Sequence, residues 1–364
     1  MAFTPRRSLD RLRTAPPVAR RIAVALPLVA ILGYIAFWFT VATAAEAQVR
    51  AWIDAQREHG IEIAIGDVTT AGFPFSIQVA IAAPAATWPG GAWTGPALTL
   101  SAAPWDWRRL NWRAPGVHRL DWTARDGRTR RATLTAAHLE GWGEAGQGGI
   151  PRVEAWLTDG DLDLPGGIAD GRITARGLLL QVLPPSAGDP AAADATPRLP
   201  FSLDAKGVTL PPALATALGR DLDRLALEMS LNGAVPRGPW PEPALAWRDG
   251  GGVLEVKQLG IVHGPLNLTG EGTLAIDPAG QPEGAFTARI TGFAETVEAL
   301  RKQGIMDNAA ADAVQVILGL LSKGPLGGPR TLDVPLTLQE RVLSVGAVKL
   351  FRLRPVDWFT RPGS

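Results

Sequence analysis

Apolar and polar residues alternate along much of the chain beyond residue 60, the pattern of β-strands with one apolar face. The segment 73–82 is the clearest case. Its alternate positions include Phe73, Phe75, Ile77 and Val79. Because Pro74 cannot donate a hydrogen bond within a sheet, we expect an edge strand here. A turn at Gly72 would pair this strand with the segment 61–65.

Similar short segments follow, separated by Gly, Asp or Pro. They are 97–100, 152–157, 201–210, 225–233, 253–259, 266–277, 284–291, 332–338 and 342–350. Helical periodicity interrupts them near 294–303 and 307–323. The pattern predicts a mainly β protein: an elongated, curved antiparallel β-sheet body with two short packing helices. Two such helices cannot cover these strands, so the apolar faces either close as a barrel or sandwich or line an open groove.

A charge-free segment from Ile22 to Ala45 precedes the strands. As a helix it would be about 36 Å long, enough to cross a hydrocarbon core of about 30 Å. Six arginines precede it and Glu46 follows it, which places the N-terminus in the cytoplasm. We therefore expect a single-pass inner-membrane protein with a cytoplasmic basic tail (1–21), a transmembrane helix (22–45) and a periplasmic body.

A cleaved signal peptide is the alternative, because Ala42-Thr43-Ala44 fits a cleavage site. The apolar run is longer than the roughly 7–15 residues of the apolar region of a signal peptide, which favours an uncleaved anchor. The body would comprise a first β region (46–183), a Pro/Ala-rich linker (184–200) and a second β region (201–364).

Composition excludes several classes of function. The chain has no cysteine, so disulfides and thiol catalysis are absent. Without its first 21 residues the chain has a net charge of −4, which argues against nucleic-acid binding. A G-x-G-x-x-G motif from Gly141 to Gly146 leads into a proline and a strand rather than a helix, so we expect no nucleotide cofactor. The scattered histidines predict no metal site, and no catalytic residues are recognisable. We expect a protein that is not an enzyme.

Tryptophan and arginine gather in the segment 103–115. The residues are Trp105, Trp107, Arg108, Arg109 and Trp112. They fit three interpretations: cross-strand Trp packing with solvent-facing Arg, contact with lipid or the membrane interface, and stacking on single-stranded nucleic acid. Export and the acidic body argue against nucleic acid. With the residues of the 73–82 segment, this cluster is the candidate lipid or membrane contact.

Several segments carry a resemblance to a known family. They are "GFPF" (72–75), "APWDW" (103–107), "AKGVTLPPAL" (205–214), "GPLNLTGEGTLAIDP" (264–278), "EGAFTARITGF" with the following helix and "GIM" (283–306), and the closing "LDVPLTLQERVLSVGAVKLFRLRP". With the charged N-terminus and single span, the chain resembles the domain-of-unknown-function 2125 family of Gram-negative envelope proteins. It is also similar to AsmA-like envelope proteins.

The first family has no established activity, and the AsmA-like resemblance implies membrane lipid handling. The expected function is lipid handling or envelope maintenance, with the inner membrane and phospholipid as partners. The alternative is a scaffolding envelope protein that binds other proteins through sheet edges.

Overall fold

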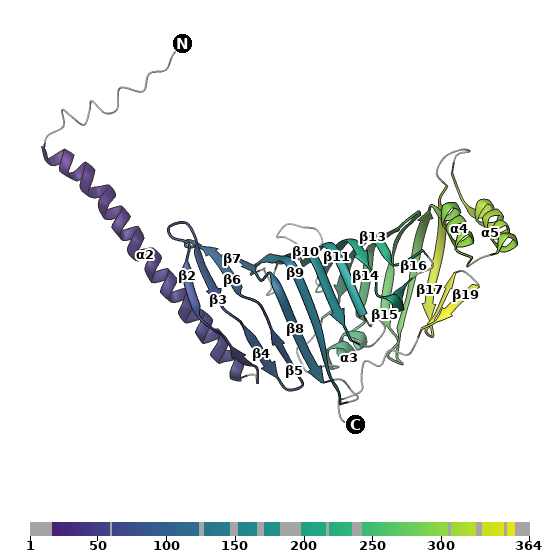
Figure 1. The fold of residues 1–364 in the computed structure, drawn as a ribbon, viewed down its shortest axis with the longest axis horizontal. Helices are drawn as coiled ribbons and strands as arrows, with labels where there is room; N and C mark the ends of the chain where they lie inside the picture. The colour runs from purple at the N-terminus through teal and green to yellow at the C-terminus, as the bar shows by residue number, and fades with distance from the viewer. Residues whose placement is uncertain are drawn as a thin grey trace, which may run out of the picture.

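The computed structural model describes residues 17–58, 60–123, 127–145, 152–165, 171–182, 198–215, 218–234, 242–304, 307–324, 330–345 and 348–353. They form a long apolar helix followed by one large antiparallel sheet that does not close (Figure 1). The prediction of an elongated, mainly β body is confirmed. The barrel alternative is wrong, because the sheet ends in free outer strands rather than pairing them with each other.

Four α-helices occur in the described ranges. They are α2 (Pro17–Glu58), α3 (Glu242–Asp249), α4 (Phe293–Lys302) and α5 (Asn308–Leu321), with a short 3-10 helix η3 (Pro212–Leu214). The expected membrane helix (22–45) lies within α2, which continues without a break to residue 58. The two expected packing helices are α4 and α5, whereas α3 follows a proline-rich segment that showed no helical periodicity.

Nineteen strands make up the sheet. They are β1 (Glu62–Ala64), β2 (Val68–Ala71), β3 (Ile77–Ile81), β4 (Ala85–Trp88), β5 (Gly91–Thr94), β6 (Leu98–Ala103), β7 (Asp106–Arg113), β8 (Gly116–Thr123), β9 (Thr129–Glu144), β10 (Arg152–Leu164), β11 (Gly171–Val182), β12 (Arg198–Thr209), β13 (Asp221–Asn232), β14 (Val253–His263), β15 (Leu266–Ile276), β16 (Pro282–Thr291), β17 (Leu332–Gln339), β18 (Val342–Val345) and β19 (Val348–Arg352).

The sheet divides into two branches at β9. One half of this long strand pairs with β7 and continues through β6 and β3 to β2, whereas the other half pairs with β8 and continues through β5 and β4 to β1. From β10 to β19, each strand pairs with the next along the chain. One sheet thus runs across the predicted linker, of which residues 198–200 belong to β12 and 184–197 lie outside the described residues.

The first hairpin differs from the expectation. The strand predicted for 73–82 begins only at Ile77, because residues 73–75 form a turn with a cis peptide bond between Phe73 and Pro74. Its hairpin partner is β2, whereas the segment 61–65 contributes β1 to the other branch. Phe73 and Phe75 therefore lie beyond the strand and do not share its apolar face.

The strand registers gather the apolar residues on one side of the sheet, called here the apolar face. Directly opposed residues share a face, so Leu180, Leu203, Leu227 and Leu259 form one row across four strands. The apolar face comprises Ile77, Val79, Ile81, Leu98, Leu100, Ala102, Leu110, Trp112, Leu134, Ala136, Leu139, Val153, Ala155, Leu157, Leu162, Ile173, Leu178, Leu180, Leu199, Phe201, Leu203, Ala205, Val208, Leu222, Leu225, Leu227, Met229, Leu231, Leu254, Val256, Leu259, Ile261, Leu266, Leu268, Leu274, Phe286, Ala288, Ile290, Leu332, Val334, Leu336 and Leu338.

A crease crosses five neighbouring strands of this sheet. The registers leave one residue unpaired on each strand from β9 to β13. These residues are Ala137, Asp159, Arg176, Gly207 and Asp223. Each extra residue reverses the alternation, so apolar residues on either side of the crease stay on one face. A Cβ on Gly160 would meet the side chain of Leu157, three residues earlier, which places both positions on the same side.

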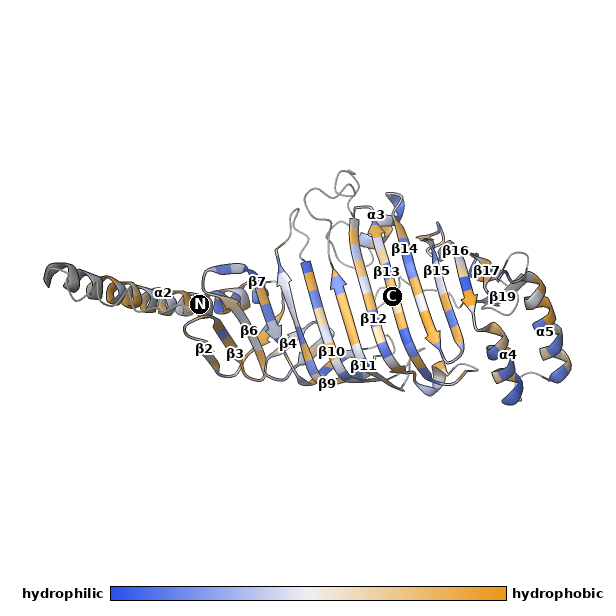
Figure 2. Ribbon diagram, turned by 90° about the horizontal axis from the view of Figure 1, so that it is seen from above, coloured by the Kyte–Doolittle hydropathy of each residue, from blue (hydrophilic) through white to orange (hydrophobic). Residues whose placement is uncertain are grey.

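The opposite side of the sheet, the polar face, is covered by cross-strand ion pairs. They are Asp121–Arg131, Glu140–Arg113, Asp161–Arg172, Asp204–Arg224 and Asp333–Arg289. From β10 to β17, by contrast, the paired positions of the apolar face carry no Asp, Glu, Lys or Arg. Figure 2 shows the resulting alternation of apolar and polar positions along the strands. Solvated charges mark the polar face as the side that water covers.

Helices cover the apolar face near its two ends. At the N-terminal end α2 packs against β1, β2 and β3, and at the far end Phe293 of α4 and Leu318 of α5 pack with Leu332 and Val334 of β17. The expected packing of the 307–323 helix is therefore confirmed at Leu318, whereas its neighbour Ile317 in the same helix is 54% exposed. In the described part of the chain no helix makes an extensive contact with β8 to β11, whereas α2 lines a cavity together with Leu110 of β7.

Candidate functional site

Helix α2 and the first strands form the best-defined site of the molecule. The second half of α2 packs on β3, where Ile77 is only 2% exposed beneath Trp38 and Ala42. The Trp38 indole donates a 3.0 Å hydrogen bond to the Ser76 carbonyl, and the Tyr34 hydroxyl donates to the Pro74 carbonyl. The helix and the β2–β3 turn are therefore held together by packing and directional bonds.

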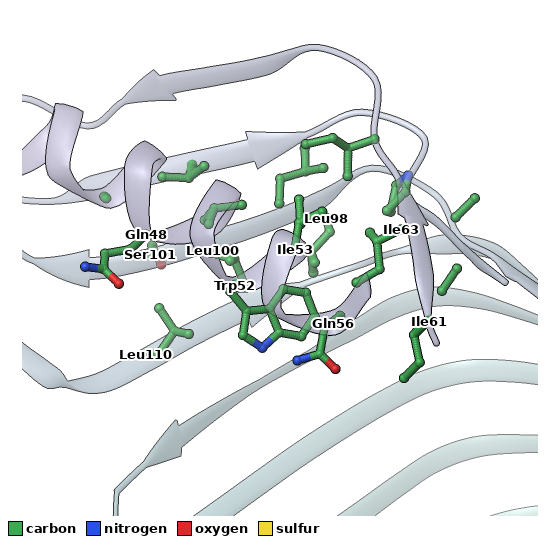
Figure 3. A pocket seen from close by; sticks show the side chains of 18 of the residues that line it. Gln48, Trp52, Ile53, Gln56, Ile61, Ile63, Leu98, Leu100, Ser101 and Leu110 are labelled. Carbon is green, nitrogen blue, oxygen red and sulfur yellow. The ribbon is translucent and has the colours of Figure 1, made fainter. Parts of the chain in front are cut away.

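A cavity of about 860 Å³ lies beside this contact, between α2 and the two branches of the sheet (Figure 3). Its lining is almost entirely apolar. The lining includes Val49, Trp52 and Ile53 from α2, Ile61, Ile63 and Ile65 from the segment that follows, Ile77, Val79 and Ile81 from β3, and Leu98, Leu100 and Leu110 from the neighbouring strands. The few polar side chains on it include Gln48 and Gln56. Such a volume and lining suit hydrocarbon chains.

The sequence-predicted aromatic residues meet at one end of the first branch. Ile77 at the start of β3 pairs with Ala102 near the end of β6. The β2–β3 turn precedes Ile77 and the β6–β7 turn follows Ala102, so the two turns lie side by side. Together with the start of β7 they carry the aromatic tip, defined as Phe73, Phe75, Trp105 and Trp107. These side chains are 49%, 75%, 64% and 48% exposed. This exposure makes the tip an unusually apolar solvent-facing surface.

The rest of the Trp/Arg cluster is divided between the two faces. Trp105 lies in the turn before β7, whereas Trp107 belongs to the strand, so the two do not share a strand face. Trp112 belongs to the apolar face, whereas Arg109 lies on the polar face, 4.2 Å from the centre of the Trp142 ring. Arg108 extends into solvent with Glu144 as its ion-pair partner at 3.7 Å.

Several charged groups form ion pairs across the polar face. Hydrogen bonds from Arg131, Arg172 and Arg289 lower the pKa values of Asp121, Asp161 and Asp333, as expected for paired carboxylates. A polar depression of about 480 Å³ follows the crease. Within the described ranges no three His, Asp or Glu side chains gather closely enough to bind a metal ion.

The apolar face is the part of the site that residue patterns alone did not reveal. Between its covered ends, large side chains such as Leu203, Leu227 and Leu259 are half-buried. Short alternating segments gave the strands, but only the registers show that their apolar sides form one surface. This surface begins at β3 in the cavity and extends to β17 under α4 and α5.

These features define a class of structure: a long apolar N-terminal helix followed by an open antiparallel sheet, whose apolar face leads away from the helix. One helix, Ala25–Glu58 within the described residues, is long and apolar enough to cross a membrane. The chain belongs to the family described as "Uncharacterized protein conserved in bacteria (DUF2125)", which matches residues 38–354. The expected family resemblance is thereby confirmed, whereas the AsmA-like resemblance stays a prediction. A search of the curated proteins found no match.

Proposed function

We propose that this protein is anchored in the inner membrane by α2 and binds phospholipid acyl chains along its apolar face in the periplasm. The observation that carries the proposal is the continuity of that face. It joins the cavity beside α2 to the far end of the sheet, and over β8 to β11 no helix of the described residues makes an extensive contact with it. Water is a poor partner for such a surface, whereas hydrocarbon chains are a good one.

The packing of α2 supports an anchor that is retained. Cleavage after Ala44 would remove Trp38 and Ala42 from the cluster around Ile77 and leave only the later α2 residues Ala45 and Val49 against it. The Trp38 indole would also be lost as a donor to Ser76. Each large apolar side chain removed from such a cluster costs about 3–5 kcal/mol, so the first strands need the helix.

The open sheet also suits a carrier better than a catalyst. Strand registers fix the row of leucines from β11 to β14, and the charged residues lie on the opposite face. The proposal therefore assigns no chemical step to the protein: acyl chains would lie against the leucines while headgroups remain in water.

Photo-crosslinking in cells tests the proposal. The full-length chain would carry p-benzoylphenylalanine at Leu227 on the apolar face, or at Glu228, the next residue on the polar face of the same strand. After irradiation and purification, intact mass spectrometry should find phospholipid adducts at residue 227 and not at 228. Absence of adducts at 227, or equal adducts at both positions, would refute lipid binding on this face.

A further inference from the structure

The aromatic tip lies beside the part of α2 that would have to be inside the membrane if this helix is the anchor. We infer that Phe73, Phe75 and Trp105 insert into the acyl layer of the periplasmic leaflet beside α2. This inference rests on the proposed anchor and goes beyond it, because it concerns a second membrane contact made by the sheet itself.

The length of α2 that lies clear of the tip is too short to cross a bilayer. The charge-free segment starts at Ile22, after Arg20 and Arg21, and the tip contacts the helix from Tyr34 onward. The twelve residues from Ile22 to Gly33 span only about 18 Å, whereas the hydrocarbon core is about 30 Å thick. About 12 Å of the crossing must therefore come from the residues after Gly33.

Those residues are the ones that the β2–β3 turn contacts. The ring centres of Phe73 and Trp38 are 5.4 Å apart in an edge-to-face arrangement, and the Trp38 indole binds the Ser76 carbonyl. A turn held at Tyr34 and Trp38 lies at the same level along α2 as these helix residues. The outer leaflet must then surround the turn as well as the helix.

The chemistry of the tip agrees with this depth. No charged residue occurs between Asp67 and Asp106, a segment that includes both turns of the tip. Phe75 is 75% exposed, yet it would be covered by acyl chains in the leaflet. Arg108 and Arg109 follow Trp107 directly, at the place where a headgroup layer would begin. The tip thus brings acyl chains of the leaflet to the start of the apolar face at Ile77.

Site-specific fluorescence tests the depth, and the absence of cysteine makes single labels simple. Full-length Phe75→Cys protein, labelled with nitrobenzoxadiazole, would be reconstituted into phosphatidylethanolamine–phosphatidylglycerol vesicles. The matched control is Leu320→Cys on α5, because Leu320 is also apolar and 81% exposed but lies at the far end of the sheet. Trp105→Cys provides a second tip position should the first variant fold poorly.

We expect lipids brominated in their acyl chains to lower the fluorescence of the Phe75 label at least twofold, and aqueous iodide to quench only the Leu320 label. Iodide quenching of both tip labels as strong as that of the control would overturn the inference. Lipid adducts at Leu227 with an aqueous tip would refute the tip insertion alone. A tip in the bilayer without adducts at Leu227 would refute lipid binding by the face alone.

Discussion

A single carboxylate in the middle of the apolar face should prevent lipid from binding there. Leu227 is half-buried, and its direct neighbours across the strands are Leu203 and Leu259. In Leu227→Asp the new carboxylate would face only apolar side chains. The matched control is Thr269→Asp, which places a carboxylate on the polar face opposite Arg289.

The size of the effect follows from the cost of placing the two side chains in hydrocarbon. At the centre of a membrane helix, Leu contributes about −0.5 kcal/mol and Asp about +3 kcal/mol, a difference of about 3.5 kcal/mol. Since 1.4 kcal/mol corresponds to about tenfold in affinity, lipid binding against residue 227 should weaken by two to three orders of magnitude. The fold should lose only about 1–2 kcal/mol, because Leu227 is not fully buried.

Lipid extraction with quantitative mass spectrometry, applied to each full-length variant purified in the same mild detergent, measures this effect. We expect the lipid bound by Leu227→Asp to fall well below wild type, and that bound by Thr269→Asp to equal wild type. Circular dichroism should be unchanged in both variants. Equal lipid in all three folded proteins would show that no acyl chain lies against this row of leucines.

Three further predictions concern the framework of the sheet. Trp38→Ala should lower the protection of the β2–β3 hairpin against hydrogen exchange while leaving β12 to β14 unchanged, since about 3–5 kcal/mol of packing is lost only at the hairpin. Arg131 lowers the pKa of Asp121 in the folded state. The stability that Asp121 contributes is therefore present above about pH 4 and is lost as the pH falls through the folded pKa. Melting temperatures measured from pH 7 to pH 3 should decline at the acidic end, and less so in Asp121→Asn. Gly207→Val should destabilise the crease by about 1–3 kcal/mol in thermal unfolding, because Gly207 has a left-handed φ of 57° and a Cβ there would meet Arg176. The control Gly177→Ala should be neutral, because a Cβ at Gly177 would meet open space.

The sequence predicts most of the strands, and it fails where alternation fails. The segment 152–157 was expected to end at Leu157, yet β10 continues to Leu164. The unpaired Asp159 has a left-handed φ of 48° and shifts the apolar positions by one residue, so the period of two is lost within the strand. The same reason applies to the segment 253–259, because the register of β14 shifts between Val256 and Leu259.

The sequence predicts which residues form the candidate site but not how they are arranged. The exposed aromatic side chains and the start of the apolar face were recognisable, because Phe, Trp and Ile in alternate or clustered positions are uncommon outside a core or a membrane contact. Their arrangement was not, because it depends on pairing β3 with β6, which lies about twenty residues further along the chain. Because β3 begins only at Ile77, Phe73 and Phe75 lie in the tip rather than in the strand. The pairing of β3 with β6 places the β6–β7 turn beside them.

The crease explains how strands this long keep a single apolar face. A twisted sheet that bends needs extra residues at the bend, and an extra residue in one strand alone would turn the rest of that strand over. Here the extra residue occurs at the same level in each strand from β9 to β13, so all five strands reverse together and their pairing continues. A protein that needed only a stable sheet could use shorter strands. One extra residue at the same level in each of five strands is expected if the sheet must keep its apolar surface uninterrupted across the bend.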